Sequence, residues 1–178
     1  MTKIKWALDP THSEINFKIK HLMITNVSGS FSKFDASVES DDDNFTNAAV
    51  SFSADVNSIN TNNEQRDGHL KSGDFFNAET YPTIKFESTK FEKSNDGNFS
   101  VTGDLTIKDV TKSVTLDVEL GGITKDPWGN TKAGFTITGK INRTHWNLSW
   151  NAALETGGVM VSEEVKINAE VQFVKQAQ

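Results

Sequence analysis

Apolar residues recur at every second position along most of the chain. This period of two is typical of β-strands with one buried face, because successive side chains of a strand point to opposite faces. The clearest segments are residues 50–56, 99–107, 133–141 and 165–173. Between residues 27 and 38 the apolar phase slips by one residue near Ser32-Lys33, which predicts a β-bulge or a corner.

Strands that are apolar on one face belong to antiparallel sheets, because parallel sheets bury both faces. About eight or nine such strands, joined mostly by short turns, must close their shared apolar face as a barrel or a sandwich. Small residues share the inward phase with large ones, as at Gly29, Gly103 and Gly139. They would leave room for one slender ligand in an eight-stranded barrel, or fit the taper of a filled one. The pattern alone leaves both alternatives open.

Three further segments are predicted as turns or a short strand. The loop at residues 121–132 contains Asp126-Pro127-Trp128-Gly129, which suits a type I turn. An Asp-Gly hairpin turn is expected at residues 94–98. A short strand at residues 152–154 should end at Gly157-Gly158.

The alternation stops between residues 64 and 78, where a short helical segment is expected. Arg66 and His69 are three apart and would share one side of a helix. They could belong to a capping network that pins the segment across the barrel, or contact the polar head of a ligand. Asp67 and His69 with a serine could also imitate a hydrolase triad, but no G-x-S-x-G elbow accompanies them.

Composition narrows the function further. The 178 residues suit one domain, residues 1–178, and carry no cysteine. The net charge of −6 and the scattered basic residues argue against a nucleic-acid partner. No stretch reaches the roughly 18 apolar residues of a membrane span, so stable membrane insertion is not expected. As written, the chain is expected in the cytoplasm; a chain trimmed of a signal peptide would look the same and would be periplasmic.

Metal and cofactor sites are not expected. The four histidines do not lie close enough in sequence to form a metal pair, and a zinc site would have to assemble from distant strands. The run Asp41-Asp42-Asp43-Asn44 suits a solvated turn, since the later ligands of a calcium loop are missing. His21 continues the phase of Phe17 and Ile19 and should point inward, as a hydrogen-bonded core residue or a head-group contact.

Several strings resemble the YceI-like family. The strongest is R-D-x-H-L-x-x-x-D-F-F-x-A-x-x-Y-P-x-I-x-F, from Arg66 to Phe86. W-x-L-D-P-x-H-S-x-I-x-F begins at Trp6, and G-x-L-T-I-x-x-V-T-K begins at Gly103. The chain departs from the family pattern at Asp109, where glycine is usual, and at His145-Trp146-Asn147, where an Asp-Phe-Gly-like string is usual. Asp and Asn tolerate a left-handed backbone, so both turns can survive.

The resemblance implies an antiparallel, eight-stranded, lipocalin-like β-barrel with a hydrophobic tunnel. The implied ligand is a polyisoprenoid, a prenyl quinone or another long-chain lipid, which the protein would carry or sequester without catalysis. Phe75 and Phe76 would gate the tunnel, His21, Arg66 and His69 would contact the head group, and Trp146 is also placed at the ligand. The remaining expected ligand contacts line the tunnel wall: Phe17, Ile19, Phe52, Phe86, Leu105, Ile107, Phe135 and Ile137.

Two other functions stay open. A filled barrel could serve as an interaction or stress-response module, which predicts no cavity and an apolar patch outside. A hydrolase or isomerase could use Asp67 and His69. A homodimer is compatible with any of these, since barrels can pair through exposed strands.

Overall fold

The computed structural model describes residues 3–22, 24–94, 96–151 and 161–177. The strand predicted at residues 152–154 and its glycine turn lie outside them. Eleven strand segments surround the barrel axis. Their bounds are β1 (Ile4–Leu8), β2 (Glu14–His21), β3 (Thr25–Phe31), β4 (Phe34–Ser40), β5 (Ala49–Asp55), β6 (Ile59–Asn60), β7 (Thr83–Lys93), β8 (Phe99–Ile107), β9 (Val110–Lys125), β10 (Thr131–Asn142) and β11 (Val161–Lys175). The described residues also form one helix, α1 (Glu64–Lys71), and three 3-10 turns, η1 (Pro10–His12), η2 (Val56–Ser58) and η3 (Arg143–Trp146).

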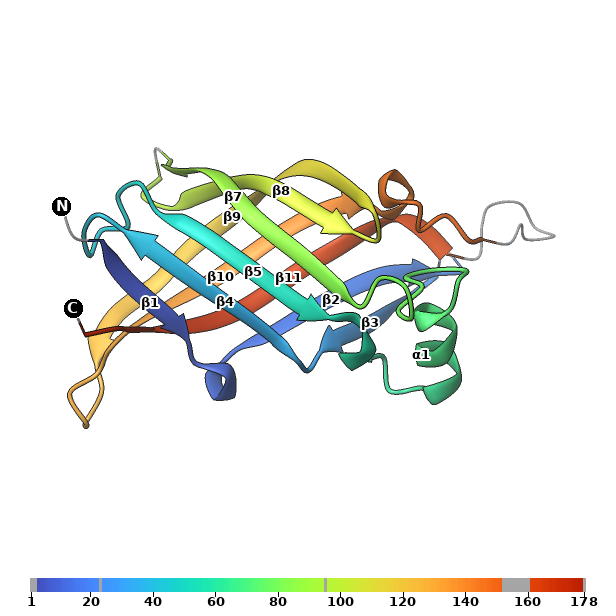
Figure 1. Ribbon diagram of the computed structural model, residues 1–178, viewed down its shortest axis with the longest axis horizontal. Helices are drawn as coiled ribbons and strands as arrows, with labels where there is room; N and C mark the ends of the chain where they lie inside the picture. The colour runs from blue at the N-terminus through green and yellow to red at the C-terminus, as the bar shows by residue number, and fades with distance from the viewer. Residues whose placement is uncertain (1–2, 23, 95, 152–160, 178) are drawn as a thin grey trace.

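The segments form one closed, antiparallel barrel (Figure 1). β1 and β2 are two halves of a first long strand, β3 and β4 of a second, and β5 with β6 makes the third; β7 to β11 are the other five. Each long strand pairs with the next in sequence, and β11 closes the barrel on β2 and β1. The sequence-based prediction of an eight-stranded antiparallel barrel is confirmed.

The first and second long strands are each interrupted at a point that the sequence explains. Pro10 has no N–H to donate to a ladder, and Asp9 accepts a hydrogen bond from the Thr11 N–H (3.2 Å) to start η1. The predicted phase slip lies between β3 and β4. There Ser32 and Lys33 leave the ladder, while the Asp55 N–H donates to the Lys33 carbonyl (2.9 Å). The corner lets both β3 and β4 present their apolar residues to the interior.

The β9–β10 hairpin corrects the predicted loop at residues 121–132. β9 continues to Lys125, and the loop is only residues 126–130. The ladder tolerates the glycines through a bulge: Gly134 pairs with Gly122 while Phe135 pairs with Leu120. The Gly129 N–H donates to the Asp126 carbonyl (3.1 Å), as a β-turn at the hairpin tip requires.

The turns that depart from the family pattern differ in their backbone. Asn147 is left-handed (φ 62°) at the end of η3, as expected for an asparagine. In the β8–β9 turn the positive φ falls on Lys108 (59°) and not on Asp109. The expectation for Asp109 was therefore wrong, because the strained position of this two-residue turn is the residue before it.

The helix is shorter than the segment expected at residues 64–78. α1 begins after Asn63, whose side chain accepts from the Arg66 N–H (3.0 Å), and ends at Lys71. The Ser72 hydroxyl donates to the His69 carbonyl (2.5 Å) and takes up an acceptor of the last turn. Residues 72–80 continue mostly as turns. Figure 1 shows α1 at one end of the barrel, and the start of β1 and the end of β11 at the other.

Candidate ligand-binding tunnel

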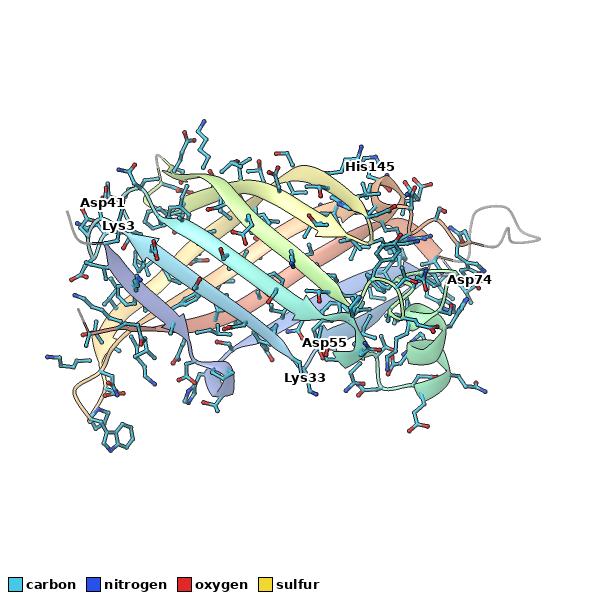
Figure 2. All side chains as sticks on the ribbon, viewed as in Figure 1. Lys3, Lys33, Asp41, Asp55, Asp74 and His145 are labelled. Carbon is cyan, nitrogen blue, oxygen red and sulfur yellow. The ribbon has the colours of Figure 1, made fainter. Side chains whose placement is uncertain are left out.

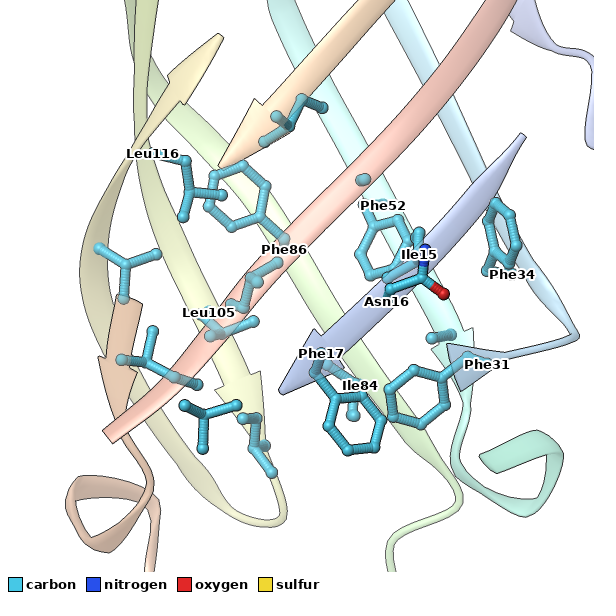
Figure 3. Close-up of a pocket in the computed structure, with 18 of the residues that line it drawn as sticks. Ile15, Asn16, Phe17, Phe31, Phe34, Phe52, Ile84, Phe86, Leu105 and Leu116 are labelled. Carbon is cyan, nitrogen blue, oxygen red and sulfur yellow. The ribbon is translucent and has the colours of Figure 1, made fainter. Parts of the chain in front are cut away.

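A cavity of about 560 Å³ occupies the barrel interior. All eight long strands contribute aliphatic or aromatic side chains to its wall, so the period-two pattern of the sequence produces the cavity directly. Figure 3 shows part of this lining, including Phe17, Phe52, Phe86 and Leu105. Every residue predicted as a ligand contact lines the cavity except Trp146. That they contact a ligand stays a prediction.

One end of the tunnel is closed by a residue that the sequence reasoning did not single out. Phe45 follows the acidic turn, is 1 % exposed and lines the tunnel. Its ring centroid lies 5.0 Å from those of Trp6 and Phe135. The backbone of Phe45 is left-handed (φ 61°), a costly conformation for a bulky residue, which turns the chain so that the ring enters the barrel.

The acidic turn that carries Phe45 is held by its own hydrogen bonds. The Asp42 carboxylate accepts from the Thr46 N–H (3.1 Å) and hydroxyl (2.9 Å) and from the Asn44 N–H (3.0 Å), and these bonds lower its pKa. Asp41 pairs with Lys3, and Figure 2 shows both at the end of the barrel away from Asp74. The prediction of a structural turn agrees with these bonds. Within the described residues, no group of three or more His, Asp or Glu side chains is placed to hold a metal ion.

The other end of the tunnel opens beneath α1. Asn63 and Gln65 line the cavity while exposed to solvent, so the lining reaches the surface here. Most of the polar side chains of the lining gather at this end: His21, Thr61, Asn63, Gln65, Arg66, His69 and Arg143. An apolar tunnel with a polar mouth matches an amphiphile whose head stays near water.

A network around Thr61 pins α1 to the barrel. Asp67 accepts from the Thr61 N–H (2.9 Å) and hydroxyl (2.5 Å). Arg66 donates from Nε to the Thr61 hydroxyl (2.8 Å) and from Nη2 to the Thr61 carbonyl (2.5 Å). The capping network expected for this segment is therefore present, and it also places Arg66 at the tunnel mouth.

His69 belongs to a separate cluster. Its Nε2 lies 2.9 Å from Asp74 Oδ2, and its ring meets the edges of Trp150 (4.7 Å between centroids) and Phe75 (5.1 Å). The carboxylate that orients His69 is thus Asp74, while Asp67 is engaged by Thr61. The pairing of Asp67 with His69 on which the enzyme alternative depends is not formed.

Phe75 and Phe76 reach opposite sides of the mouth. Phe75 is buried against Trp150 (5.5 Å between centroids), whereas Phe76 meets the edge of Phe31 (6.4 Å). Both rings line the tunnel, and that they gate it stays a prediction. Residues 72–77 form a tight turn rather than a strand or helix, so the adjacent side chains diverge.

Arg143 is a buried cation at the mouth whose role the sequence reasoning missed. It is 3 % exposed and donates to four carbonyls, those of Leu148 (2.5 Å), Trp150 (3.0 Å), Val161 (3.2 Å) and Ser162 (2.8 Å). Burial lowers the pKa of its guanidinium, although a guanidinium stays charged at physiological pH. The signal was available: Arg143 continues the inward phase of Ile141 and Gly139.

Trp146 lies in the wall and not at the cavity. Its side chain is 2 % exposed, and its indole Nε1 donates to the Leu105 carbonyl (2.9 Å). Trp146 sits in η3, whose turn directs the ring under the end of β8. The substitution of Trp for the usual Phe is therefore absorbed by packing, away from the tunnel lining.

Comparisons with known proteins agree on a family. The family profile described as YceI-like domain matches residues 6–173. A UPF0312 protein of Staphylococcus aureus strain N315 is 43 % identical over 169 residues, covering 94 % of this chain and 96 % of that protein. The crystal structure of a Campylobacter jejuni YCEI protein is 34 % identical, with a TM-score of 0.75 over 89 % of this chain and 90 % of that one.

Two more distant structures share the fold alone. Burkholderia cenocepacia BcnA has a TM-score of 0.80 at 24 % identity, over 93 % of this chain and 98 % of its own. A polyisoprenoid binding domain from Saccharophagus degradans, implicated in plant cell wall breakdown, has a TM-score of 0.69 at 14 % identity, over 96 % and 98 %. In the part of the chain described here, no helix has the length and hydrophobicity of a membrane span.

Proposed function

The chain belongs to the YceI-like family, and from the tunnel that it encloses we propose that it binds a long apolar amphiphile and carries or sequesters it. The observation that carries this proposal is the cavity of about 560 Å³, apolar along its length and polar at its mouth. A long chain needs no nucleophile or base, only surface. Each Å² of apolar surface buried contributes about 25 cal/mol, so such a tunnel gives affinity without specific polar or catalytic groups.

The ligand is proposed to be a polyisoprenoid, a prenyl quinone or a similar lipid, which enters the tunnel with its tail first. Its tail would run from Phe76 at the mouth toward Phe45 at the closed end. Its head would stay beside Arg66, His69 and His21, the polar side chains expected to meet it. Neither Arg66 nor Arg143 has a carboxylate partner within ion-pair distance in the described part of the chain, which favours a head that offers hydrogen-bond acceptors.

The two alternatives have less support. A filled barrel would leave no cavity, whereas this interior holds one. An enzyme using Asp67 and His69 would need the two side chains to cooperate, but Thr61 and Asp74 hold them apart. The proposal is therefore a binding protein and not a catalyst.

A pair of variants on one strand tests the proposal. Ile137 lines the tunnel, and its neighbour Thr138 is exposed on the outer face of β10. Ile137→Asn places an amide against the bound chain, and leaving it unpaired should lower the affinity for a prenyl quinone about tenfold or more. Thr138→Asn should leave the affinity unchanged. Equal affinities for the two variants, measured by displacement of a fluorescent fatty acid, would place the binding site elsewhere.

A further inference from the structure

Two inward-facing glycines let large side chains lie flat against the tunnel wall. A Cβ placed on Gly29 would lie 2.3 Å from Cζ of Phe17 and 2.9 Å from each Cε of the same ring. Phe17 and Gly29 are directly opposite each other on β2 and β3. The ring of Phe17 therefore lies across the space that any other residue at position 29 would fill.

Gly139 makes the same kind of room on the other side of the barrel. A Cβ there would lie 2.3 Å from Cδ2 of Leu116, and the next nearest atoms also belong to that side chain. Both Phe17 and Leu116 line the tunnel (Figure 3), whereas Gly29 and Gly139 are covered by them. Gly103 is a different case, because backbone atoms of Glu87 and Ser88 also approach it and a side chain would push the strands apart.

Side chains lifted off the wall would narrow the tunnel. The backbone of β3 lies beneath the Phe17 ring, and Phe31 lies beside it with ring centroids 5.7 Å apart. An added Cβ at position 29 would thus push the ring away from the wall and toward the lumen. Leu116 would move inward for the same reason, although as a smaller and more flexible side chain it should obstruct the lumen less.

We propose that Gly29 and Gly139 set the width of the tunnel. With glycine at both positions the tunnel admits methyl-branched chains as well as unbranched ones. This inference rests on the proposed function and adds to it the residues that set the width of the chain admitted. An isoprenoid carries a methyl branch at regular intervals and is wider than a straight acyl chain of equal length. A wall kept flat by glycine fits the wider chain, while a straight chain can pass a partly obstructed lumen.

The test compares two saturated alcohols, phytanol and hexadecan-1-ol, which share a main chain and differ only in the methyl branches of phytanol. Dissociation constants are measured by displacement of a fluorescent fatty acid from the wild type, Gly29→Ala, Gly139→Ala and Gly134→Ala. Gly134 is the matched control, because it lies on a strand and nothing lies within 4 Å of its Cβ position. Thermal unfolding of each unliganded variant shows that it is folded.

Gly29→Ala should weaken the binding of phytanol about tenfold or more relative to that of hexadecan-1-ol. This is the usual cost of a methyl group that does not fit an apolar pocket. Gly139→Ala should have a smaller effect of the same sign, and Gly134→Ala none. The double variant Gly29→Ala/Phe17→Leu should recover phytanol binding, since the displaced ring is gone. Recovery separates a bore effect from general damage to the barrel.

Other outcomes are decisive. Equal weakening of both alcohols by Gly29→Ala, or no weakening, would overturn the role of the glycines while leaving the binding function intact. Failure of the double variant to recover phytanol would do the same. A wild type that binds neither alcohol, nor any prenyl quinone, would instead overturn the proposed function itself. If Gly29→Ala does not fold, Gly139→Ala and its partner Gly139→Ala/Leu116→Ala decide the question.

Discussion

Single side chains hold this barrel together at points that no periodic pattern reveals. Asp9 is one of them. It accepts hydrogen bonds from His12 Nδ1 (2.8 Å), the Thr11 hydroxyl (2.8 Å) and Lys132 Nζ (3.1 Å), and so ties η1 to the start of β10. The bond with His12, then those with Thr11 and Lys132, hold the pKa of the Asp9 carboxyl well below its usual value of 3.8.

Asp9→Asn should therefore lower stability in a pH-dependent way. A folded-state pKa below the unfolded one stabilises the fold above the unfolded pKa, and the gain is lost as pH falls below it. At pH 7 the variant should lose about 1–3 kcal/mol, the usual range for a charged hydrogen bond, and the gap to the wild type should narrow below about pH 4. Thermal unfolding across pH 3–7 checks this. Asp117→Asn is the control, an exposed strand carboxylate without an ion pair in the described chain; an equal, pH-independent loss in both variants would contradict the account.

Phe45 is the second such residue, and its truncation should be costly. Phe45→Ala removes a ring that is 1 % exposed between Trp6 and Phe135, and leaves a cavity at the closed end. The expected loss is about 3–5 kcal/mol of unfolding free energy in urea titration. Trp128→Ala removes an even larger ring that is 83 % exposed, and should change stability by only about 0.5 kcal/mol. Similar losses in the two variants would show that Phe45 is not part of the core.

These residues also mark what the sequence could not predict. Phe45 follows a polar run and has no periodic neighbours, so only the folded turn brings it inside. Arg143 was predictable as inward from its phase with Ile141, but its four carbonyl partners come from segments up to nineteen positions away. Lys108 carries the left-handed backbone expected at Asp109, because turn type depends on how β8 and β9 meet.

Among the elements, α1 is the most separable. Its eight residues are fewer than an isolated helix needs in water, and it depends on the Asn63 cap and the Thr61 network. Asn63→Ala should reduce hydrogen-exchange protection of the α1 amides by about 0.5–2 kcal/mol. Gly68→Ala should raise it by up to about 1 kcal/mol, since nothing lies within 4 Å of its Cβ position.

The barrel strands serve as the control for that experiment. Exchange of the β8 and β9 amides should be unchanged in both variants if α1 opens by itself. Protection that changed equally in α1 and in β8 would mean that the helix unfolds only together with the barrel. In that case the tunnel mouth, which α1 covers, would not open by local unfolding of the helix.

The strands themselves were predictable and the connections less so. Alternation found the strands because each has one buried face, and the phase slip found the corner between β3 and β4. The hairpin that joins β9 to β10 was assigned too long a loop, since Gly121 and Gly122 read as turn residues while the ladder absorbs them in a bulge. The predicted helical segment extends beyond Lys71 because residues 72–78 lack alternation, and turns lack alternation just as helices do.

At the scale of the whole molecule, the choice between a filled and a hollow barrel depends on packing. Gly29, Gly103 and Gly139 in the inward phase were compatible with either. The structure resolves the choice, because the large neighbours of Gly29 and Gly139 lie against the wall and leave the lumen open. A fold class can be read from hydrophobic period, but the bore of a barrel depends on which way each ring turns over its neighbour.

Native mass spectrometry of the purified protein, followed by organic extraction of whatever it releases, tests the central claim most directly. We expect a long-chain or isoprenoid amphiphile bound at about one per chain, or the same occupancy after incubation with a prenyl quinone. Ile137→Asn should lose that adduct while Thr138→Asn keeps it. A mass that stays that of the bare chain after incubation with prenyl quinones and straight-chain lipids would contradict the account.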